Sequence, residues 1–507
     1  MLFDANEQVP FALPPQPYVP THDWEKTLLI RDLSVIEDVG RTNVWSNASG
    51  TCEMIGNPNG EWSFQTLMED IANPARTGVD LHDFVTHWIL RWNTTHDVRG
   101  DVLPASVQGV NELWYDNVFS GWPKLAPGTG NYDDILDMTK APFRLVAIVN
   151  RLDLRRGVAY GGSTGELRFV FEMIDPATCG SRPFNLILEY EVPLGSCEEA
   201  RDWGTLWYEL DSYALGDPDL SAKLSDITTR ITTRDVAPGR PNGSALLSLR
   251  TNEQFMAWPH YPDRNWDMRA FTLDGDSGYL EPSALDRTPA GPWEVPDATT
   301  GEAPIDAFIS SNLTAILDGT HWVEPTWNGH APFQGGHAGY GQVACWISPC
   351  TSPGNHTEDR GRWWGTASSG TTRDQRAARH RFSLATCNGC HGREGIDDAT
   401  VGVSVPLATP DQPFRHVEGH GPGTAATLSR FLTGTHGGCH PSTNLLVPPL
   451  GTNDCADGCC PVGDPVHGYE SDQVHFADLL RRQADLDALV YSSCLMSLTS
   501  DHEPTTH

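Results

Sequence analysis

Five consecutive residues form the densest group of chemically reactive side chains in this chain: Cys387-Asn388-Gly389-Cys390-His391. Two cysteines three positions apart on one turn can each form a thioether with a vinyl group of a haem, and the histidine that follows is then placed to bind the iron. The spacing therefore predicts covalent haem attachment through Cys387 and Cys390, with His391 as an axial ligand.

Two other interpretations of the same residues stay open. A C-x-x-C pair also forms short disulfides and redox-active dithiols, and Cys439 with His440 could complete a zinc site that the pair begins. A chance C-x-x-C-H is rare in 507 residues that contain 12 cysteines and 19 histidines, so haem attachment is our leading hypothesis.

The second axial position of such an iron needs a ligand from elsewhere in the chain. Downstream of the motif the one methionine, Met496, lies beside the apolar face of the terminal helical segment, so we expect it in the core. His416 and His420 lie in FRHVEGHGPG, where glycine and proline let the chain fold over the opposite haem face. We predict His416 as the ligand and His420 as the second choice, which gives low-spin iron suited to electron transfer. With neither in place, the open position would suit haem-based oxidation.

Two helical segments frame the motif, at residues 371–386 and 475–498. Over about residues 371–500 the chain resembles small c-type cytochromes, whose terminal helices cross beside the haem edge. The resemblance implies a mainly α, cytochrome c-like domain at 371–507, after a loop-rich connection at 351–370. The apolar face expected on the last helix consists of Phe476, Leu479, Leu480, Leu486, Leu489, Val490 and Leu495.

The region before the connection, residues 1–350, is expected to be α+β with an antiparallel sheet. Three runs rich in valine, isoleucine and phenylalanine predict a meander at 143–154, 166–174 and 184–193. Phe84, Trp88, Leu90 and Trp92 have helical spacing within 63–95. Further helices are predicted at 109–120, 198–214, 218–232 and 304–317, and further strands at 245–251 and 267–273.

Segments spread over most of the chain resemble a family of large secreted proteins of myxobacteria. These segments are LLIRDLSVIEDVGRT, EWSFQTLMEDIA, AIVNRLDL, ELRFVFEM, HRFSLATCNGCHGRE, LSRFLTGT and FADLLRRQADLDAL. The resemblance implies export and supplies no activity.

Charge and cysteine content narrow the class of protein further. With 34 basic and 66 acidic side chains the formal net charge is −32, which disfavours nucleic-acid binding and steers a basic redox partner protein toward the chain. No apolar run is long enough to span a bilayer, and the first residues do not have the pattern of a signal peptide. Twelve cysteines favour an oxidising compartment, so we expect a periplasmic or extracellular protein whose signal peptide has been removed.

Weaker candidate sites are explained more simply. Asp274-Gly-Asp276-Ser-Gly278 resembles the start of a calcium loop, but Leu285 stands where an EF-hand has its bidentate glutamate, so a tight turn is favoured over calcium. His321, His330 and His337 do not have metal-site spacing and are expected to be solvated loop residues. The pair Trp363 and Trp364 could stack on a sugar, although burial is the commoner role of tryptophan.

A rival hypothesis is a disulfide-stapled extracellular binding or structural protein without haem, in which Cys387 and Cys390 bond to each other. Apart from these two, five cysteines precede the motif and five follow it, so complete pairing requires at least one disulfide between the two regions. Cys179 and Cys197 flank a predicted strand, and Cys345 and Cys350 close a short loop. Cys52 is therefore expected to make the crossing bond.

The haem hypothesis predicts that the double variant Cys387→Ala and Cys390→Ala loses covalent haem, because the thioethers alone tie the macrocycle to the chain. His391→Ala should keep covalent haem with an altered spectrum. Absorption and mass of the denatured protein, from a host competent in haem attachment, measure both results. Cys439→Ala serves as the control and should change neither; covalent haem that survives in the double variant would falsify the hypothesis.

Overall fold

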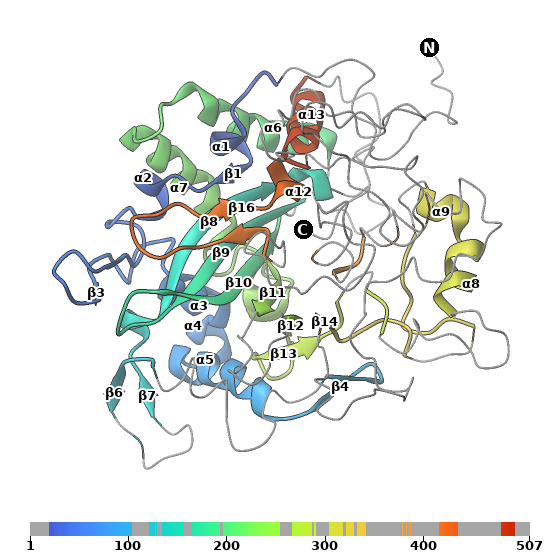
Figure 1. Ribbon diagram of the computed structural model, residues 1–507, viewed down its shortest axis with the longest axis horizontal. Helices are drawn as coiled ribbons and strands as arrows, with labels where there is room; N and C mark the ends of the chain where they lie inside the picture. The colour runs from blue at the N-terminus through green and yellow to red at the C-terminus, as the bar shows by residue number, and fades with distance from the viewer. Residues whose placement is uncertain are drawn as a thin grey trace, which may run out of the picture.

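An antiparallel sheet is the centre of the computed structural model (Figure 1). Its strands follow the order β1-β8-β9-β10-β11-β12-β13, and β14 pairs with β12 beside β13. The sheet and the helices around it confirm the predicted α+β class and antiparallel sheet. The structure describes residues 20–103, 121–126, 128, 134–155, 165–192, 196–253, 266–285, 288–290, 304–317, 321–328, 332–340, 378, 382, 385–387, 391, 415–433 and 478–491.

Strands β8 to β12 fall on the predicted apolar runs, whereas β1, β13 and β14 lie outside those runs. Their bounds are β1 Leu29–Ile30, β8 Phe143–Arg151, β9 Glu166–Ile174, β10 Ser181–Glu191, β11 Leu246–Glu253, β12 Trp266–Leu273, β13 Leu280–Ser283 and β14 His337–Tyr340. Four two-stranded ladders join β2 Trp45–Ser46 to β3 Glu53–Met54, β4 His96–Val98 to β5 Asp101–Leu103, β6 Lys124–Ala126 to β7 Ile135–Leu136, and β15 Val417–Glu418 to β16 Thr427–Leu428.

Helices α3 to α9 and α13 fall on predicted helical segments, whereas α1, α2 and α12 are not predicted, and the segment 109–120 lies outside the described residues. Ser63 accepts a hydrogen bond from the Thr66 backbone N–H and begins α3, and Asp217 followed by Pro218 begins α7. The helix bounds are α1 Trp24–Thr27, α2 Leu33–Ile36, α3 Phe64–Ala72, α4 Pro74–Thr77, α5 Leu81–Leu90, α6 Cys197–Tyr208, α7 Pro218–Thr232, α8 Pro304–Ser311, α9 Leu313–Leu317, α12 Arg430–Thr433 and α13 Asp478–Val490.

One face of the sheet is apolar and lies under helices α3, α5 and α7. Alternate residues of β9 and β10 point to this side, with Phe171 opposite Leu186 and Phe169 opposite Leu188. Rings from the helices stack on the strands, and the centroids of Phe64 and Phe143 are 4.7 Å apart. This layer is the main hydrophobic core, and it buries the tryptophans Trp62, Trp88, Trp92 and Trp207 completely.

The opposite face of the same strands is charged and also buried. Arg144 lies opposite Glu172 and Arg168 opposite Glu189, and all four side chains are almost completely inaccessible. Nε of Arg144 donates to Glu172 Oε1 at 2.8 Å, and Nη2 of Arg168 lies 3.1 Å from Glu189 Oε1. Buried charges of this kind require opposite partners, and the alternation of the strands supplies them.

The hairpin β15–β16 covers part of the charged face and lies across the sheet in Figure 1. Nδ2 of Asn185 donates to the Val417 carbonyl at 3.2 Å, and the backbone N–H of Gly421 donates to Glu172 Oε1 at 3.3 Å. A Cβ at Gly419 would lie 1.6 Å from Glu172 Oε2, so this position has room for glycine alone. The hairpin therefore fits closely onto the charged strands.

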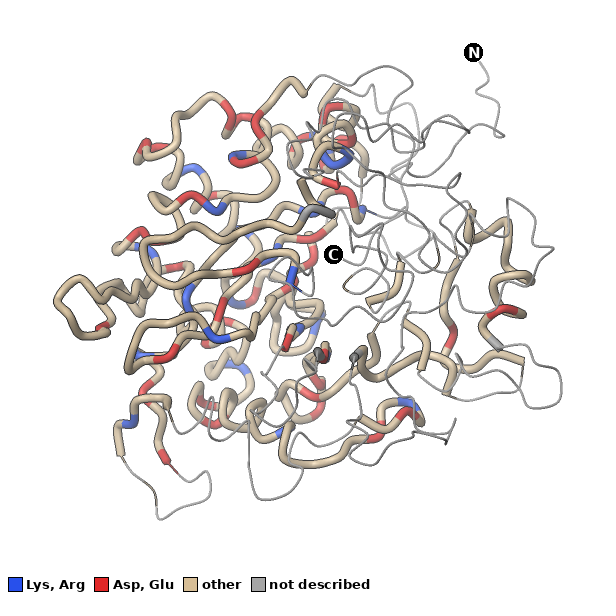
Figure 2. The backbone as a smooth tube through the Cα atoms, viewed as in Figure 1, with Lys and Arg blue, Asp and Glu red and all other residues tan. Residues whose placement is uncertain are grey.

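Helix α13 is buried on both sides, which differs from the amphipathic helix that the sequence predicts. Its leucines pack on α6, where Gly204 allows the approach of Leu486 and Leu489. Its charged residues are buried too, because Arg481 donates to Asp153 Oδ2 at 2.8 Å and Asp485 accepts from Arg155 Nη2 at 2.9 Å. Figure 2 shows basic and acidic positions close together at the sheet and at α13.

Helices α8 and α9 form a smaller core with Phe308, Phe333 and Phe382.

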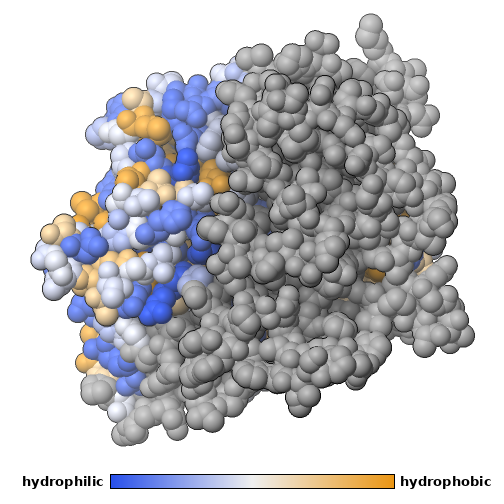
Figure 3. All heavy atoms as spheres, in the orientation of Figure 1, coloured by the Kyte–Doolittle hydropathy of each residue, from blue (hydrophilic) through white to orange (hydrophobic). Residues whose placement is uncertain are grey.

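Large exposed apolar side chains elsewhere are dispersed, and Figure 3 shows hydrophobic groups in several separate places on the visible described surface. Within the described ranges, no helix has the length and apolar character needed to cross a membrane.

The disulfides differ from the expected pairing. Cys52 bonds to Cys179, with their Cα atoms 5.2 Å apart, so the prediction that Cys52 crosses to the C-terminal region is wrong. The turn between β9 and β10 carries Cys179 toward β3 rather than toward Cys197, which a count along the sequence does not reveal. Cys197 is also in a disulfide, and its partner lies outside the described residues.

We predict that Cys197 makes the disulfide that joins the two regions. With Cys52 and Cys179 paired, and Cys345 and Cys350 close enough in sequence to pair, Cys197 is left for a downstream cysteine. Helix α6, which begins at Cys197, packs on α13 of the C-terminal region. Non-reducing peptide mapping should link its peptide to one containing Cys439, Cys455, Cys459, Cys460 or Cys494. A bond from Cys197 to Cys345 or Cys350 would refute this, and the Cys52–Cys179 peptide is the internal control.

A second prediction concerns Glu253 at the end of β11, on the apolar side of the sheet. Burial raises the pKa of Glu253 to about 7 from 4.5, against the opposing charge of Arg269, and Trp92 Nε1 lies 3.1 Å from its Oε1. The folded state therefore binds this proton more tightly than the unfolded state, so stability falls as pH rises from about 4.5 to about 7.

Glu253→Gln should remove this loss of stability, and its advantage over the wild type should grow by about 3 kcal/mol across that pH window. Arg269 keeps Asp267 as a partner at 3.0 Å in the variant. Denaturant unfolding at a series of pH values measures the effect. Glu198→Gln removes an exposed carboxylate on α6 and is the control; equal slopes for all three proteins would contradict the prediction.

Candidate functional site

A cavity of about 60 Å³ lies on the charged face of the sheet, under the C-terminal segments. Its floor is made by β1, β8, β9, β10 and β11, and its cover by the hairpin, α12, α13 and His391. The apolar lining residues are Leu29, Val149, Val170, Ile187, Val417 and Leu432. The polar lining residues are Arg151, Arg168, Asn185, Asn252, His391, His416 and Arg482.

His391 and His416 meet at this cavity. The centroids of their rings are 4.5 Å apart, with 2% of His391 and 6% of His416 exposed. The structure therefore brings together the histidine of the C-x-x-C-H motif and the histidine that the sequence predicts as its counterpart. His391 lies beside Asn252 of β11, and His416 comes from the hairpin that covers β10.

The hairpin fixes the position of His416. His416 and Ser429 stand one position beyond the Val417–Leu428 pair, and the Ser429 N–H donates to the His416 carbonyl at 3.0 Å. Nδ1 of His416 is 2.7 Å from Ser429 Oγ. His391 is in contact with Asn252 of β11, whose Nδ2 lies 3.5 Å from Nδ1 of His391.

The surroundings of His416 keep its ring neutral. Burial, together with the positive charges of Arg482 and Arg151, lowers the pKa of His416 to about 3. A neutral imidazole has a lone pair on one nitrogen, which is the form that binds metals. The cavity thus holds an uncharged imidazole among guanidinium groups.

The arginines of the cavity are held by buried carboxylates behind them. Nε of Arg151 donates to Asp153 Oδ1 at 2.9 Å, and Nε of Arg168 donates to Glu166 Oε2 at 2.9 Å. Burial alone would raise the pKa of Asp153, but Arg151, Arg482 and Arg481 lower it well below its ordinary value. Asp153 therefore stays ionised and anchors the guanidinium groups at the end of β8.

The other predicted haem residues are placed differently. Cys387 is buried in an apolar cluster with Met268, Ala270, Leu285 and Ala338, and its backbone N–H donates to Thr288 Oγ1 at 3.1 Å. Cys390 and Met496 lie outside the described residues. His420 is exposed on the hairpin, where its Nε2 is 2.6 Å from Thr427 Oγ1. Of the two predicted counterparts, only His416 reaches the cavity.

The two histidines are residue types that bind iron, but their present spacing is too short for a shared metal. A metal–imidazole bond is about 2 Å long, so two ligands on opposite sides of a metal place their nitrogens about 4 Å apart and their ring centroids farther still. With centroids at 4.5 Å, the two rings must separate to admit the metal. A haem macrocycle also exceeds a cavity of about 60 Å³, so the covering segments would move outward to hold it.

Sequence reasoning missed the polar residues of the cavity floor. Arg151, Arg168, Asn185 and Asn252 alternate with apolar residues in strands whose other face is the core. The signal in the sequence is this alternation of charged and large apolar residues, as in ELRFVFEM, within strands too central to face solvent. Helix α13 contributes Arg482 from the side that the sequence predicts to be solvated.

The expectation of solvated loop histidines is wrong for two residues. His321 is buried 5.6 Å from the ring of Phe382, and His337 is buried on β14, with its Nδ1 4.0 Å from Asp101 Oδ2. His321 lies against the smaller core, and His337 lies at the edge of the sheet. His330, Trp363 and Trp364 lie outside the described residues.

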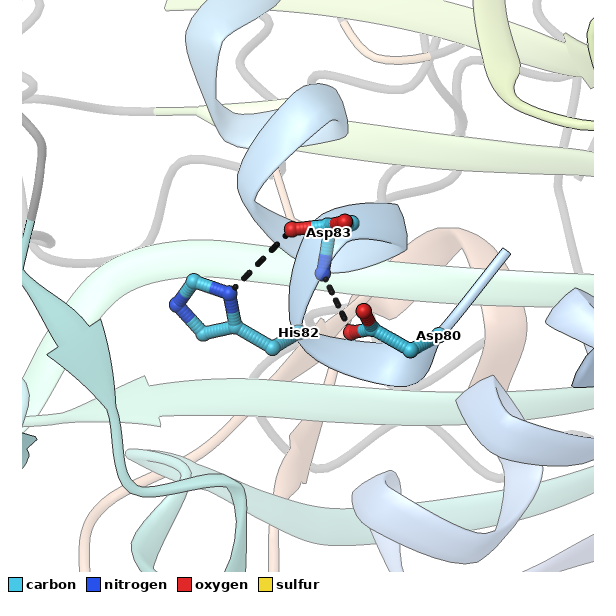
Figure 4. Close-up of side chains that lie close together, drawn as sticks. All are labelled: Asp80, His82 and Asp83. Atoms are coloured by element: carbon cyan, nitrogen blue, oxygen red, sulfur yellow. Dashed lines mark hydrogen bonds and ion pairs between the residues drawn. The ribbon is translucent and has the colours of Figure 1, made fainter. Parts of the chain in front are cut away.

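Asp274 and Asp80 each accept hydrogen bonds from nearby backbone N–H groups, one in a turn and one at the start of a helix. Asp274 accepts hydrogen bonds from the backbone N–H groups of Asp276 and Ser277, so a tight turn stands where a calcium loop was considered. Asp80, His82 and Asp83 come close together at the start of α5 (Figure 4). Asp80 accepts from the Asp83 N–H at 3.0 Å as the helix cap, and both carboxylates are exposed.

No family model, no curated protein and no solved structure matches the chain. The functional argument therefore rests on the motif and on the geometry of the cavity.

Proposed function

We propose that the chain is an exported c-type haem protein that transfers electrons, with thioether bonds at Cys387 and Cys390 and iron bound by His391 and His416. One observation supports the proposal above all others: the buried contact between these two histidines. One imidazole comes from the motif and the other from the segment predicted to oppose it, and neutral imidazole is a common metal ligand, so both rings stand where they could bind one metal after separating.

When bound, the haem would supply a one-electron couple, whose potential is low with two imidazole ligands compared with a methionine ligand. The residues of the chain set the environment of that couple. His416 stays neutral and available, and burial under the hairpin keeps bulk water away from the two rings. The positive charges of Arg151 and Arg482 favour the reduced state of any redox group placed here.

The proposal extends to compartment and partner. The Cys52–Cys179 disulfide agrees with folding in a periplasmic or extracellular space. A net charge of −32 would draw a redox partner protein with a basic docking surface. A cytochrome c-like, mainly α arrangement of residues 371–507 remains part of this proposal.

Two other functions remain as candidates. If the ring of His416 leaves the iron, the open position would support haem-based oxidation of a small substrate. A disulfide-stapled binding or structural protein without haem is the rival. Cys387 lies in an apolar cluster at the sheet edge and does not line the cavity, which favours a protein without haem, but it is a buried thiol and not part of the disulfide that this rival assigns to it. An absorption spectrum of natively exported protein separates the haem proteins from the rival, which is colourless.

The deciding experiment compares His416→Ala with His420→Ala, two histidines of the same hairpin that differ in burial. His416→Ala should convert ferric low-spin haem to high-spin, because an axial ligand is lost, and added imidazole should restore the low-spin spectrum. His420→Ala should keep the wild-type spectrum, because its ring is exposed and bonded to Thr427.

Unchanged low-spin character in His416→Ala would overturn the assignment of this ligand. A methionine-to-iron charge-transfer band in the wild-type ferric spectrum would overturn it as well, because it would put a thioether in that position.

A further inference from the structure

The floor of the cavity has one hydrogen-bond donor and one acceptor that the described chain leaves unused. Arg168 donates through Nε and Nη2 to Glu166, and its Nη1 has no hydrogen-bond partner among the described residues. Asn185 donates through Nδ2 to Val417, while its buried Oδ1 accepts nothing there. Asn185 is 2% exposed and its Oδ1 is itself buried, so bulk water does not satisfy this acceptor.

The cavity also has an excess of positive charge on its surface. Arg151, Arg168 and Arg482 line it, and among the described lining residues none is acidic. The carboxylates that balance these arginines, such as Asp153 and Glu166, stand behind them and are not part of the lining. Within the part of the lining that the structure describes, an anion in the cavity would therefore face guanidinium groups and no carboxylate.

We propose that this cavity binds a small oxyanion that carries a hydroxyl group, of the size of bicarbonate. Its charged oxygens accept hydrogen bonds from Nη1 of Arg168 and the neighbouring guanidinium groups, and its hydroxyl donates to Oδ1 of Asn185. A volume of about 60 Å³ holds about four water-sized groups, which matches the four heavy atoms of bicarbonate. Binding uses no iron ligand, but the cavity has this form only while no haem separates His391 from His416, so the proposal applies to the chain without haem.

Bicarbonate and nitrate provide a matched pair of probes. Both are planar, singly charged and built of four heavy atoms, but only bicarbonate has a hydroxyl to give to Asn185. Calorimetric titration of the full chain in a closed cell should show saturable binding of bicarbonate, with nitrate at least tenfold weaker and chloride as the ionic-strength control. Equal affinity for bicarbonate and nitrate, or no saturable binding, would overturn the proposal.

Two variants locate the site. Asn185→Leu keeps the size of the side chain and removes Oδ1, so bicarbonate should bind no better than nitrate. Val170→Leu adds one methylene to the cavity wall without changing a polar group, and it should weaken both anions at least tenfold. Circular dichroism and thermal unfolding check the fold of each variant. Wild-type bicarbonate affinity in a folded Val170→Leu protein would place the binding elsewhere and reject the cavity.

The titration uses chain produced without haem attachment, and the absorption spectrum of chain from a host competent in haem attachment tests the haem separately. Bicarbonate binding to the haem-free chain supports the oxyanion site whatever that spectrum shows, and its absence rejects the site. A colourless protein from the competent host rejects the proposed function alone.

Discussion

Burial of the charged face of the sheet beneath other segments of the chain is the constraint on which this structure depends. The strands β8 to β11 put aromatic and aliphatic side chains on one face and arginine, glutamate and asparagine on the other, and both faces are covered. Removing one member of such a buried ion pair typically costs about 3–5 kcal/mol, because its partner is left as an unpaired charge. The segments that cover the charged face must therefore match it residue by residue.

The C-terminal segments meet this requirement in two ways. Helix α13 brings its own charges, so that Asp153 at the end of β8 accepts from Arg481 and Arg155 donates to Asp485. The hairpin β15–β16 brings backbone groups instead, and Gly419 leaves space for Glu172 against its main chain. Both segments are thereby held on the sheet, and their residues complete the cavity that the strands begin.

The sequence predicts the strands and helices well, because period-2 and period-3.6 patterns are local. It also predicts that His416 lies close to His391, because a glycine- and proline-containing segment downstream of the motif is recognisable in the sequence. The sequence does not predict the disulfide partner of Cys52, the burial of the polar side of α13 or the place of Arg168 in the cavity. Each of these depends on which distant segment of the chain lies against the residue. From the sequence alone, a charged residue within an apolar strand suggests an edge strand or a solvent-exposed face. Only the structure shows that another segment of the chain covers it.

The same constraint explains the chemistry available in the cavity. The carboxylates that pair with Arg151 and Arg168 stand behind them and balance their charge. At the cavity surface, however, the guanidinium groups are closer than the carboxylates, so the local charge is positive. That local excess of positive charge, added to burial, keeps the imidazole of His416 in its neutral form. A site that holds histidine neutral favours a ligand that needs a nitrogen lone pair, and a site lined by guanidinium groups favours an anion. Both preferences arise from one arrangement of paired charges on the sheet.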